Sequence, residues 1–292
     1  MRQSHAMPER RQGSLARPGC QLYYEVSGRG QPIIFAHGLG GNHASWWQQV
    51  AALAPHYTCV TFAHRGFQPS SMVAGGPDPA DFADDLAALI EHLRLPEVAI
   101  VAQSMGGWTA LEYALRQTGR LRALLLAATT GSIDPARLRE PERSRLDSWQ
   151  RASEAARHEQ ARRGIHVACG ERMASEQPAM HLLYRHIDDS NSGLDKEALR
   201  RRLVAARTRR PQELAVLDCP VLLISGEEDI VMPPFAAEAL AAVLPRAAVA
   251  HIPAAGHSAY FERAPIFNRL LQDFLERCGL GPAAGASIAR EI

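Results

Sequence analysis

Short apolar segments rich in β-branched residues recur along this chain, and between them apolar residues return every three or four positions. The first pattern is typical of strands buried on both faces, and the second of amphipathic helices. We predict strands at residues 21–26, 32–36, 58–62, 98–102, 123–128, 221–225 and 248–252. We predict helices at residues 45–53, 79–93, 105–116, 234–243 and 265–277. This alternation indicates an α/β fold with a mostly parallel central sheet and helices on both faces.

The alternation stops between Ser132 and Pro211, where the chain is polar and rich in arginine. This stretch holds 17 basic and 12 acidic residues and shows helical periodicity in pieces. A helical insertion over one end of the sheet explains it better than a loop of that length. The predicted organisation is therefore a core of residues 19–131 and 212–278, with a helical insertion at 132–211. We also predict a flexible arm at residues 1–18 and a flexible tail at residues 279–292.

Composition narrows the function classes. The formal net charge of +1 argues against a polyanion such as nucleic acid as partner of the whole chain. The apolar runs are too short to span a bilayer, and the polar N-terminal stretch does not resemble a secretory signal. The five cysteines have neither disulfide-framework nor metal-ligand spacing, so we expect reduced thiols and no bound metal. These features predict a soluble, cytoplasmic protein.

Ser104 lies between a predicted strand and a predicted helix, in the stretch Val101-Ala102-Gln103-Ser104-Met105-Gly106-Gly107. A serine on such a turn, with a glycine two residues later, is typical of a nucleophile elbow. The usual pattern also has glycine two positions before the serine, where this chain has Ala102. Because alanine is the next smallest residue, close packing of strand on helix can survive. Ser104 is therefore the candidate nucleophile.

A serine nucleophile needs a base, and a histidine base needs a carboxylate that fixes its tautomer. His257 lies in a glycine-containing loop just after the last predicted strand, and Asp229 follows the strand before it. Glu227 and Glu228 are adjacent alternatives for the acid. All these residues follow the carboxyl ends of strands, where open α/β sheets place their sites. The chain order of serine, aspartate and histidine also fits a hydrolytic triad.

Acyl transfer requires two N–H donors for the negative charge that develops on the carbonyl oxygen. The backbone N–H of Met105 follows the nucleophile and is one candidate. The glycine-rich loop His37-Gly38-Leu39-Gly40-Gly41 follows a predicted strand, and the N–H of Leu39 is the second candidate. The chemistry needs no metal or organic cofactor.

These motifs together resemble the α/β-hydrolase superfamily over about residues 20–278: His37-Gly38, the Ser104 turn, the stretch from Gly226 to Asp229, and Gly256-His257. Residues 63–70 also resemble the family's D-x-R-G-x-G-x-S loop, with departures at Ala63 and Gln68. Some members carry the acid after the strand that follows the nucleophile helix, where residues 128–131 have no carboxylate. The resemblance implies that the insertion is a cap that covers the pocket and selects substrates.

The serine argues against the family branches that attack with aspartate. The run from Gly256 to Glu262 resembles enol-lactonases and small esterases, which implies a serine carboxylesterase or lactonase with a small-molecule substrate. Two alternatives stay open: a carbon–carbon hydrolase of diketone-like acids, and a non-catalytic small-molecule receptor of the same fold.

The candidate pocket residues are His37, Gly38, Gln103 and Trp108, although Trp108, like Trp46 and Trp47, fits the core better. Arginines of the insertion could attract a carboxylate-bearing substrate. A charge run of this kind is more often a solvated helix face, so the sequence does not assign an acidic substrate.

Overall fold

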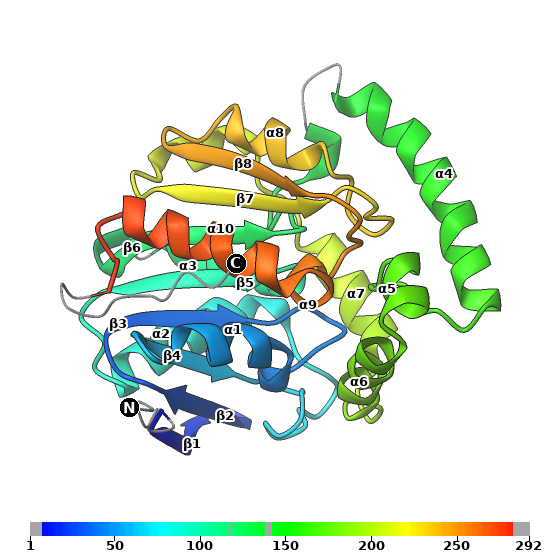
Figure 1. Ribbon diagram of the computed structural model, residues 1–292. Helices are drawn as coiled ribbons and strands as arrows, with labels where there is room; N and C mark the ends of the chain where they lie inside the picture. Colours follow the sequence, from blue (N-terminus) through cyan, green and yellow to red (C-terminus); the bar gives the residue numbers. More distant parts are fainter. Residues whose placement is uncertain (1–7, 117, 138–141, 283–292) are drawn as a thin grey trace, which may run out of the picture.

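One eight-stranded sheet, in the order β1-β2-β4-β3-β5-β6-β7-β8, runs through the computed structural model, which describes residues 8–116, 118–137 and 142–282 (Figure 1). The β1–β2 and β2–β4 pairs are antiparallel, and every other pair is parallel. The strands are β1 (Arg10–Arg17), β2 (Cys20–Ser27), β3 (Gln31–Ala36), β4 (Tyr57–Phe62), β5 (Val98–Gln103), β6 (Leu121–Ala127), β7 (Val221–Gly226) and β8 (Ala247–Ile252). The seven predicted strands are all present, and the predicted fold class is confirmed.

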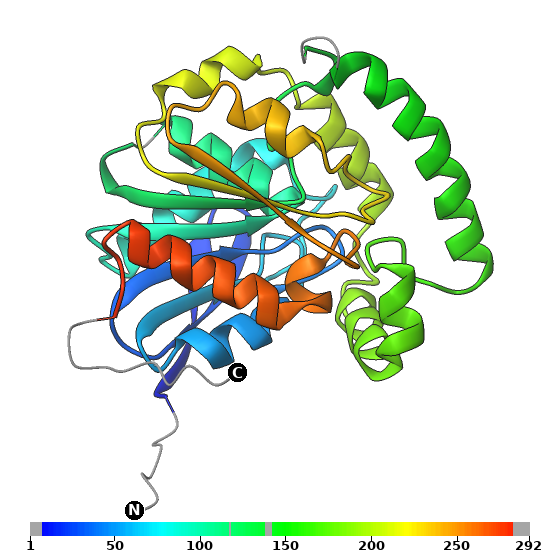
Figure 2. The same cartoon turned by 45° about the horizontal axis from the view of Figure 1, so that its top comes forward.

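Helices cover both faces of the sheet (Figure 2). The helices α2, α3 and α8 pack on one face, and α1 and α10 lie side by side on the other. The α-helices of the described chain are α1 (Trp47–Leu53), α2 (Phe82–His92), α3 (Met105–Arg116), α4 (Glu142–Arg162), α5 (Glu171–Glu176), α6 (Pro178–Asp189), α7 (Lys196–Ala205), α8 (Ala236–Ala241), α9 (Ala259–Glu262) and α10 (Ala264–Arg277). Two apolar cores therefore sandwich the sheet.

Hydrophobic spacing explains these elements. Every residue of β5 is buried, as expected for a central strand that is covered on both faces. In α10, Phe267, Leu271 and Phe274 recur four and three positions apart and turn one stripe into the core. The same rule places the core-facing residues of α2 and α3 on the opposite face.

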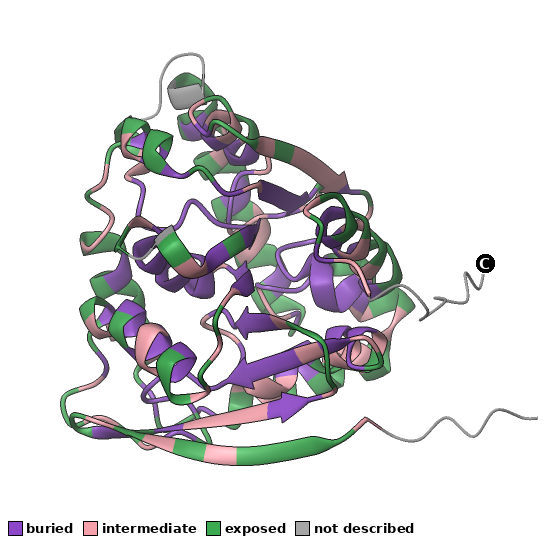
Figure 3. Ribbon diagram, turned by 90° about the vertical axis from the view of Figure 1, so that its left-hand side faces the viewer, coloured by how far each residue is buried: buried purple, intermediate pink, exposed green. Residues whose placement is uncertain are grey.

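The predicted flexible arm at residues 1–18 is wrong for its second half, because Arg10–Arg17 form the edge strand β1. This strand pairs with β2 along its whole length, from Arg10 with Ser27 to Arg17 with Cys20. All of its residues are exposed or half-buried (Figure 3). An edge strand held by backbone bonds and carrying charged side chains needs little apolar sequence. Hydrophobic patterning therefore does not reveal it.

The described residues between β6 and β7 form the helices α4 to α7, which lie beyond the carboxyl ends of the parallel strands (Figure 1). A single bridge between Ile133 and Arg209 brings the two ends of this insertion together. The predicted tail at 279–292 is wrong at its start, because Leu280 is buried in the core beneath α10. Residues 283–292 lie outside the described part of the chain.

The glycine at position 106 permits close packing of α3 on β3, so Gly106→Ala should destabilise the protein. A Cβ atom there would lie 2.2 Å from the carbonyl oxygen of Ala36, which is backbone and cannot move aside. We expect a loss of about 1–3 kcal/mol in the free energy of unfolding, measured by urea denaturation. Gly119→Ala is the matched control, because no atom lies within 4 Å of its added Cβ. Equal losses in both variants would contradict this account.

Candidate active site

Ser104 occupies the turn between β5 and α3 with a backbone φ of 52°, a left-handed conformation that is rare outside glycine. Its N–H donates to the carbonyl of Ala127 at the end of β6 (3.0 Å), which ties the turn to the neighbouring strand. Gly106 and Gly107 let α3 start directly against β3 and Thr129. Ala102, where the common pattern has glycine, is fully buried in the core. The local geometry is that of a nucleophile elbow.

His257 and Asp229 meet in the interior beside this turn. The Nδ1 atom of His257 lies 2.8 Å from Oδ2 of Asp229, and both side chains are buried. The other carboxylate oxygen, Oδ1, accepts hydrogen bonds from the backbone N–H groups of Val231 and Met232 at 2.7 and 2.9 Å. These donors leave Oδ2 directed at the imidazole, which orients the ring.

The neighbouring acids point elsewhere. Glu228 pairs with Arg172 of α5 at 2.7 Å, and Glu227 is exposed. Of the three carboxylates considered from the sequence, the structure therefore places Asp229 against the histidine.

Ser104 and His257 line a common cavity of about 490 Å³ between the sheet and the insertion. Leu39, Gln103, Met105 and Trp108 also contribute to its wall, together with residues of α4, α6 and α7. His37 and Gly38, predicted as pocket residues, are not among the lining side chains. His37 is fully buried behind the loop, and Gly38 has no side chain to present. Of the other tryptophans, Trp46 is buried in the core and Trp47 is exposed.

The loop that carries Leu39 is oriented by two buried histidines. The backbone N–H of His64 donates to Nε2 of His37 at 3.0 Å, so the proton of the His37 ring lies on Nδ1. That Nδ1–H donates to the carbonyl oxygen of Gly38 at 2.8 Å. A trans peptide directs its C=O and N–H to opposite sides. The N–H of Leu39 is therefore turned away from His37.

His64 extends this network. Its Nδ1 lies 3.0 Å from Nε2 of His37, and its Nε2 lies 2.9 Å from the Thr109 hydroxyl of α3. Burial lowers the pKa of His37 to about 3 and also lowers that of His64 far below its usual value. Both rings are neutral near pH 7, and they connect the Leu39 loop to the helix that follows Ser104.

Glu262 supports the histidine loop and was not identified as a site residue from the sequence. Its carboxylate accepts hydrogen bonds from the N–H groups of Gly256 (2.9 Å) and Ser258 (3.2 Å), which flank His257. Burial raises the pKa of Glu262 to about 7. The only available sequence signal was an acidic residue five positions after the candidate histidine, which is too common a pattern to identify a role.

The insertion contributes most of the charge around the cavity. Arg157, Lys196, Arg200 and Arg207 line it, whereas Asp188 is the single carboxylate among its described lining residues. Asp188 is engaged by Lys196 at 2.7 Å and lies 3.3 Å from Nε2 of His166. The cavity therefore combines a reactive end at Ser104 with a wall that has an excess of positive charge.

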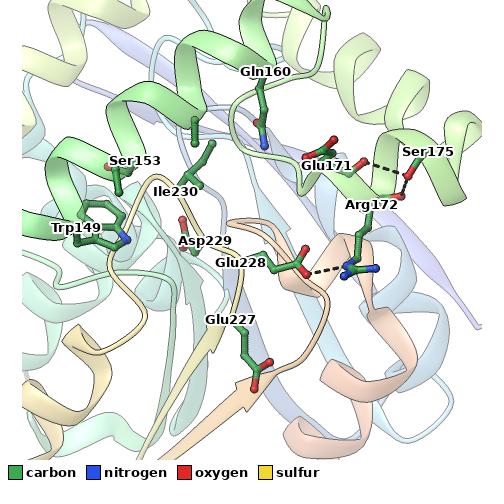
Figure 4. A pocket seen from close by; sticks show the side chains of 12 residues that line it. Trp149, Ser153, Gln160, Glu171, Arg172, Ser175, Glu227, Glu228, Asp229 and Ile230 are labelled. Carbon is green, nitrogen blue, oxygen red and sulfur yellow. Dashed lines mark hydrogen bonds and ion pairs between the residues drawn. The ribbon is translucent and has the colours of Figure 1, made fainter.

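A second cavity, of about 670 Å³, lies between α4, α5 and the loop that carries Asp229 (Figure 4). Its charged side chains include Arg172 and Glu228, which pair with each other. Arg157 of α4 donates from Nη1 to the carbonyl of Ile230 at 2.8 Å, so α4 is attached to the acid's loop near this cavity. Ser104 and His257 lie on the other cavity, not on this one.

Within residues 8–116, 118–137 and 142–282, no helix is long and apolar enough to cross a membrane. Across the same residues, no three His, Cys, Asp or Glu side chains are grouped so that they could hold a metal ion.

Comparison with known proteins identifies the family. The alpha/beta hydrolase fold family matches residues 31–264, so the chain belongs to that family. It is 30% identical over 267 residues to the putative non-heme bromoperoxidase BpoC of Mycobacterium tuberculosis, covering 87% of this chain and 97% of that protein. A thermophilic esterase from Thermogutta terrifontis superposes with a TM-score of 0.72 at 26% identity, covering 92% and 99% of the two chains.

The enol-lactonase from Burkholderia xenovorans LB400 also has a TM-score of 0.72, at 23% identity, with 90% of this chain and all of that one covered. At this identity the likeness shows the fold alone. Taken with the family match, these relatives support an enzyme of the hydrolase type.

The buried histidines should make the protein sensitive to acid. An unfolded histidine binds a proton near pH 6.5, whereas folded His37 does so near pH 3, so acidification across this window favours the unfolded chain. Each such group removes about 1.4 kcal/mol of stability per pH unit. His37→Asn keeps a donor for the Gly38 carbonyl and should give a shallower loss between pH 6 and 4.

The measurement is urea denaturation at pH 7, 6, 5 and 4. His158→Asn, which changes an exposed histidine of α4, should keep the wild-type slope. An unchanged slope in His37→Asn would show that this ring does not govern acid sensitivity.

Proposed function

We propose that the protein is a serine hydrolase that cleaves a small carboxylic ester or lactone through an acyl-enzyme. The observation that carries the proposal is the joint placement, on one cavity, of Ser104 on a left-handed elbow and of His257, whose ring is held from behind by Asp229. An oriented serine, a base and a carboxylate that fixes the base are the groups that acyl transfer needs. The cavity volume of about 490 Å³ suits a small molecule.

The proposed first step is attack of the Ser104 hydroxyl oxygen on the substrate carbonyl carbon while His257 takes the hydroxyl proton. Asp229 stabilises the imidazolium that forms and holds the ring by its bond to Nδ1. The negative carbonyl oxygen is bound by the N–H groups of Met105 and Leu39. Met105 is the first residue of α3, so its N–H has no partner within the helix, and the Leu39 N–H is directed by the His37 bond.

Collapse of this intermediate breaks the ester bond, and His257 returns the proton to the leaving alcohol. Water then attacks the acyl-enzyme, its proton passing to His257, and the acid is released as Ser104 regains its hydrogen. In a lactone the alcohol freed in the first step remains part of the acyl chain, so the second step releases a single hydroxy acid. The insertion acts as a cap that lines the cavity, and no metal or organic cofactor takes part.

The two alternative functions differ from this one in what would be observed. A carbon–carbon hydrolase would cleave diketone-like acids with the same serine, and at a higher kcat/KM than simple esters. A receptor would bind small molecules saturably without turning over any ester. The buried support of His257 by both Asp229 and Glu262 favours catalysis, because a binding pocket needs no oriented base.

Removing the nucleophile should abolish turnover. Ser104→Ala is expected to lower kcat/KM for p-nitrophenyl acetate and butyrate by at least about 10³-fold, since no oxygen remains to form the acyl-enzyme. Release of p-nitrophenol at pH 7.5 is the readout. Ser192→Ala removes a hydroxyl from an exposed residue and should retain the wild-type rate. Equal rates in wild type and Ser104→Ala would refute the assignment.

Replacing the acid tests the role of the histidine's partner. Asp229→Asn should lower kcat by up to about 10⁴-fold, because an amide at this position no longer fixes the productive tautomer of His257. Glu227→Gln neutralises an exposed carboxylate two residues away and is the matched control, expected to remain within twofold of wild type. Comparable effects of the two substitutions would show that Asp229 has no special role. Steady-state kinetics with p-nitrophenyl butyrate distinguish the outcomes.

A further inference from the structure

One cationic side chain at the cavity has neither an ion pair nor a hydrogen-bonded acceptor among the described residues. Arg207, two residues beyond the end of α7, lines the cavity that holds Ser104. The residue is partly exposed, but its Nε atom is buried and has no hydrogen-bond partner. No acidic side chain in the described parts of the chain forms an ion pair with it. Burial lowers the pKa of Arg207, as expected for a cation removed from water without compensation.

Neighbouring cations of the insertion are all engaged. Lys196 pairs with Asp188 at 2.7 Å, and Arg200 pairs with Glu197 at 2.8 Å. Arg202 donates to three backbone carbonyls at residues 75–77. Arg209 forms ion pairs with Glu112 and Glu213. Compared with these cations, Arg207 is therefore the one whose guanidinium has neither an ion pair nor a hydrogen-bonded acceptor among the described residues.

A second guanidinium adds to the charge excess. Arg157 of α4 lines the same cavity and donates to the carbonyl of Ile230 and to the hydroxyl of Ser153, both uncharged acceptors. Asp188 cannot neutralise these arginines as well, because it already forms an ion pair with Lys196 and lies against His166. Asp229 is committed to His257. Two cations thus face the cavity without a carboxylate among the described residues.

A buried cation without a partner destabilises a protein. Removing the acid from a buried ion pair has the same effect on stability, because it leaves the cation unpaired. The end of α7 favours a nearby positive charge, but it supplies no acceptor to the buried Nε. An anionic ligand in the cavity would supply a counter-charge to the accessible part of the guanidinium. We propose that the substrate carries a carboxylate, and that Arg207 binds it as the specificity-determining residue. This inference rests on the proposed function, since it names the substrate class of the same site.

The donor geometry of the Arg207 guanidinium favours a carboxylate. The two Nη groups of a guanidinium present paired donors, which match the two oxygens of a planar carboxylate. Apolar side chains such as Leu203, Val204 and Met232 line the cavity alongside the arginines. A short aliphatic chain between the scissile ester and the carboxylate fits this combination. We infer esters or lactones whose acyl or alcohol part ends in a carboxylate.

Matched substrate pairs test this directly. Monomethyl succinate, glutarate and adipate carry the charge on the acyl side, and methyl butyrate, valerate and hexanoate are their neutral counterparts. The alcohol side is tested with 4-acetoxybutyrate against butyl acetate, and 6-acetoxyhexanoate against hexyl acetate. Acid release in a pH-stat gives kcat/KM for each. We expect wild type to prefer the charged member of at least one pair by about tenfold or more, the scale of a hydrogen bond to a charged group.

Substitution of Arg207 should remove this preference. In Arg207→Gln the ratio of kcat/KM for the charged to the neutral ester should fall by about 10- to 100-fold. Arg207→Lys keeps the charge without the paired donors and should restore only part of the ratio. Arg201→Gln removes an exposed arginine from α7 that does not line the cavity, and should keep the wild-type ratio.

Thermal unfolding separates recognition from a structural role. Because unliganded Arg207 is an unpaired cation, Arg207→Gln should melt at the same or a higher temperature than wild type. Glutarate or adipate should raise the melting temperature of wild type and of Ser104→Ala, but not that of Arg207→Gln. A lower melting temperature in Arg207→Gln, or equal stabilisation of all three proteins by the diacids, would overturn the assignment.

The inference and the proposed function can fail separately. If Ser104→Ala abolishes turnover of neutral esters but wild type shows no preference for any charged ester, the carboxylate inference is wrong and the serine mechanism stands. A preference retained in Arg207→Gln also overturns the role of this residue. If ester turnover is unaffected in Ser104→Ala, the proposed function itself fails, and stabilisation by the diacids still reports whether Arg207 binds a carboxylate.

Discussion

The left-handed backbone of Ser104 is the constraint on which the site depends. A non-glycine residue in this region costs on the order of 1–3 kcal/mol, and it persists only where the surroundings leave no alternative. Here β5 is buried on both sides, the Ser104 N–H is bound by Ala127, and α3 starts against the carbonyl of Ala36 with only the hydrogen of Gly106 between them. The packing free energy of the central sheet thus maintains the strained turn that exposes the serine to the cavity.

The sequence was sufficient for the elements that bury apolar side chains and for the residues that follow central strands. It could not reveal β1, because Arg10–Arg17 are held by backbone pairing and carry little apolar surface. Asp229 could be preferred over Glu227 and Glu228 by its position, but its contact with His257 depends on the fold of two separate loops. Glu262 and His64 were not predicted as functional, since each supports the site through contacts between distant segments.

The charge of the insertion is a second feature whose role could not be predicted from the sequence. As a composition, an arginine-rich helical stretch indicates a solvated surface, and exposed residues such as Arg162 and Arg201 fit that description. Arg207 differs only because the chain turns at the end of α7 and brings it to the cavity. Binding sites of enzymes commonly lower the stability of the folded protein, because groups arranged for a ligand lack partners when the ligand is absent. The ion pairs of each residue in the structure are thus more informative about ligand binding than the net charge of the insertion.

The insertion and the histidine loop also meet directly, at Gly170 and Gly256. A Cβ atom on Gly256 would lie 2.6 Å from the backbone nitrogen of Gly170, and one on Gly170 would lie 2.5 Å from the carboxylate of Glu262. The insertion is therefore not an independent module placed on a finished catalytic core. In evolution or in engineering, an insertion that replaces this one must keep the close contact between the two glycines. Without that contact, a change of specificity would also displace His257.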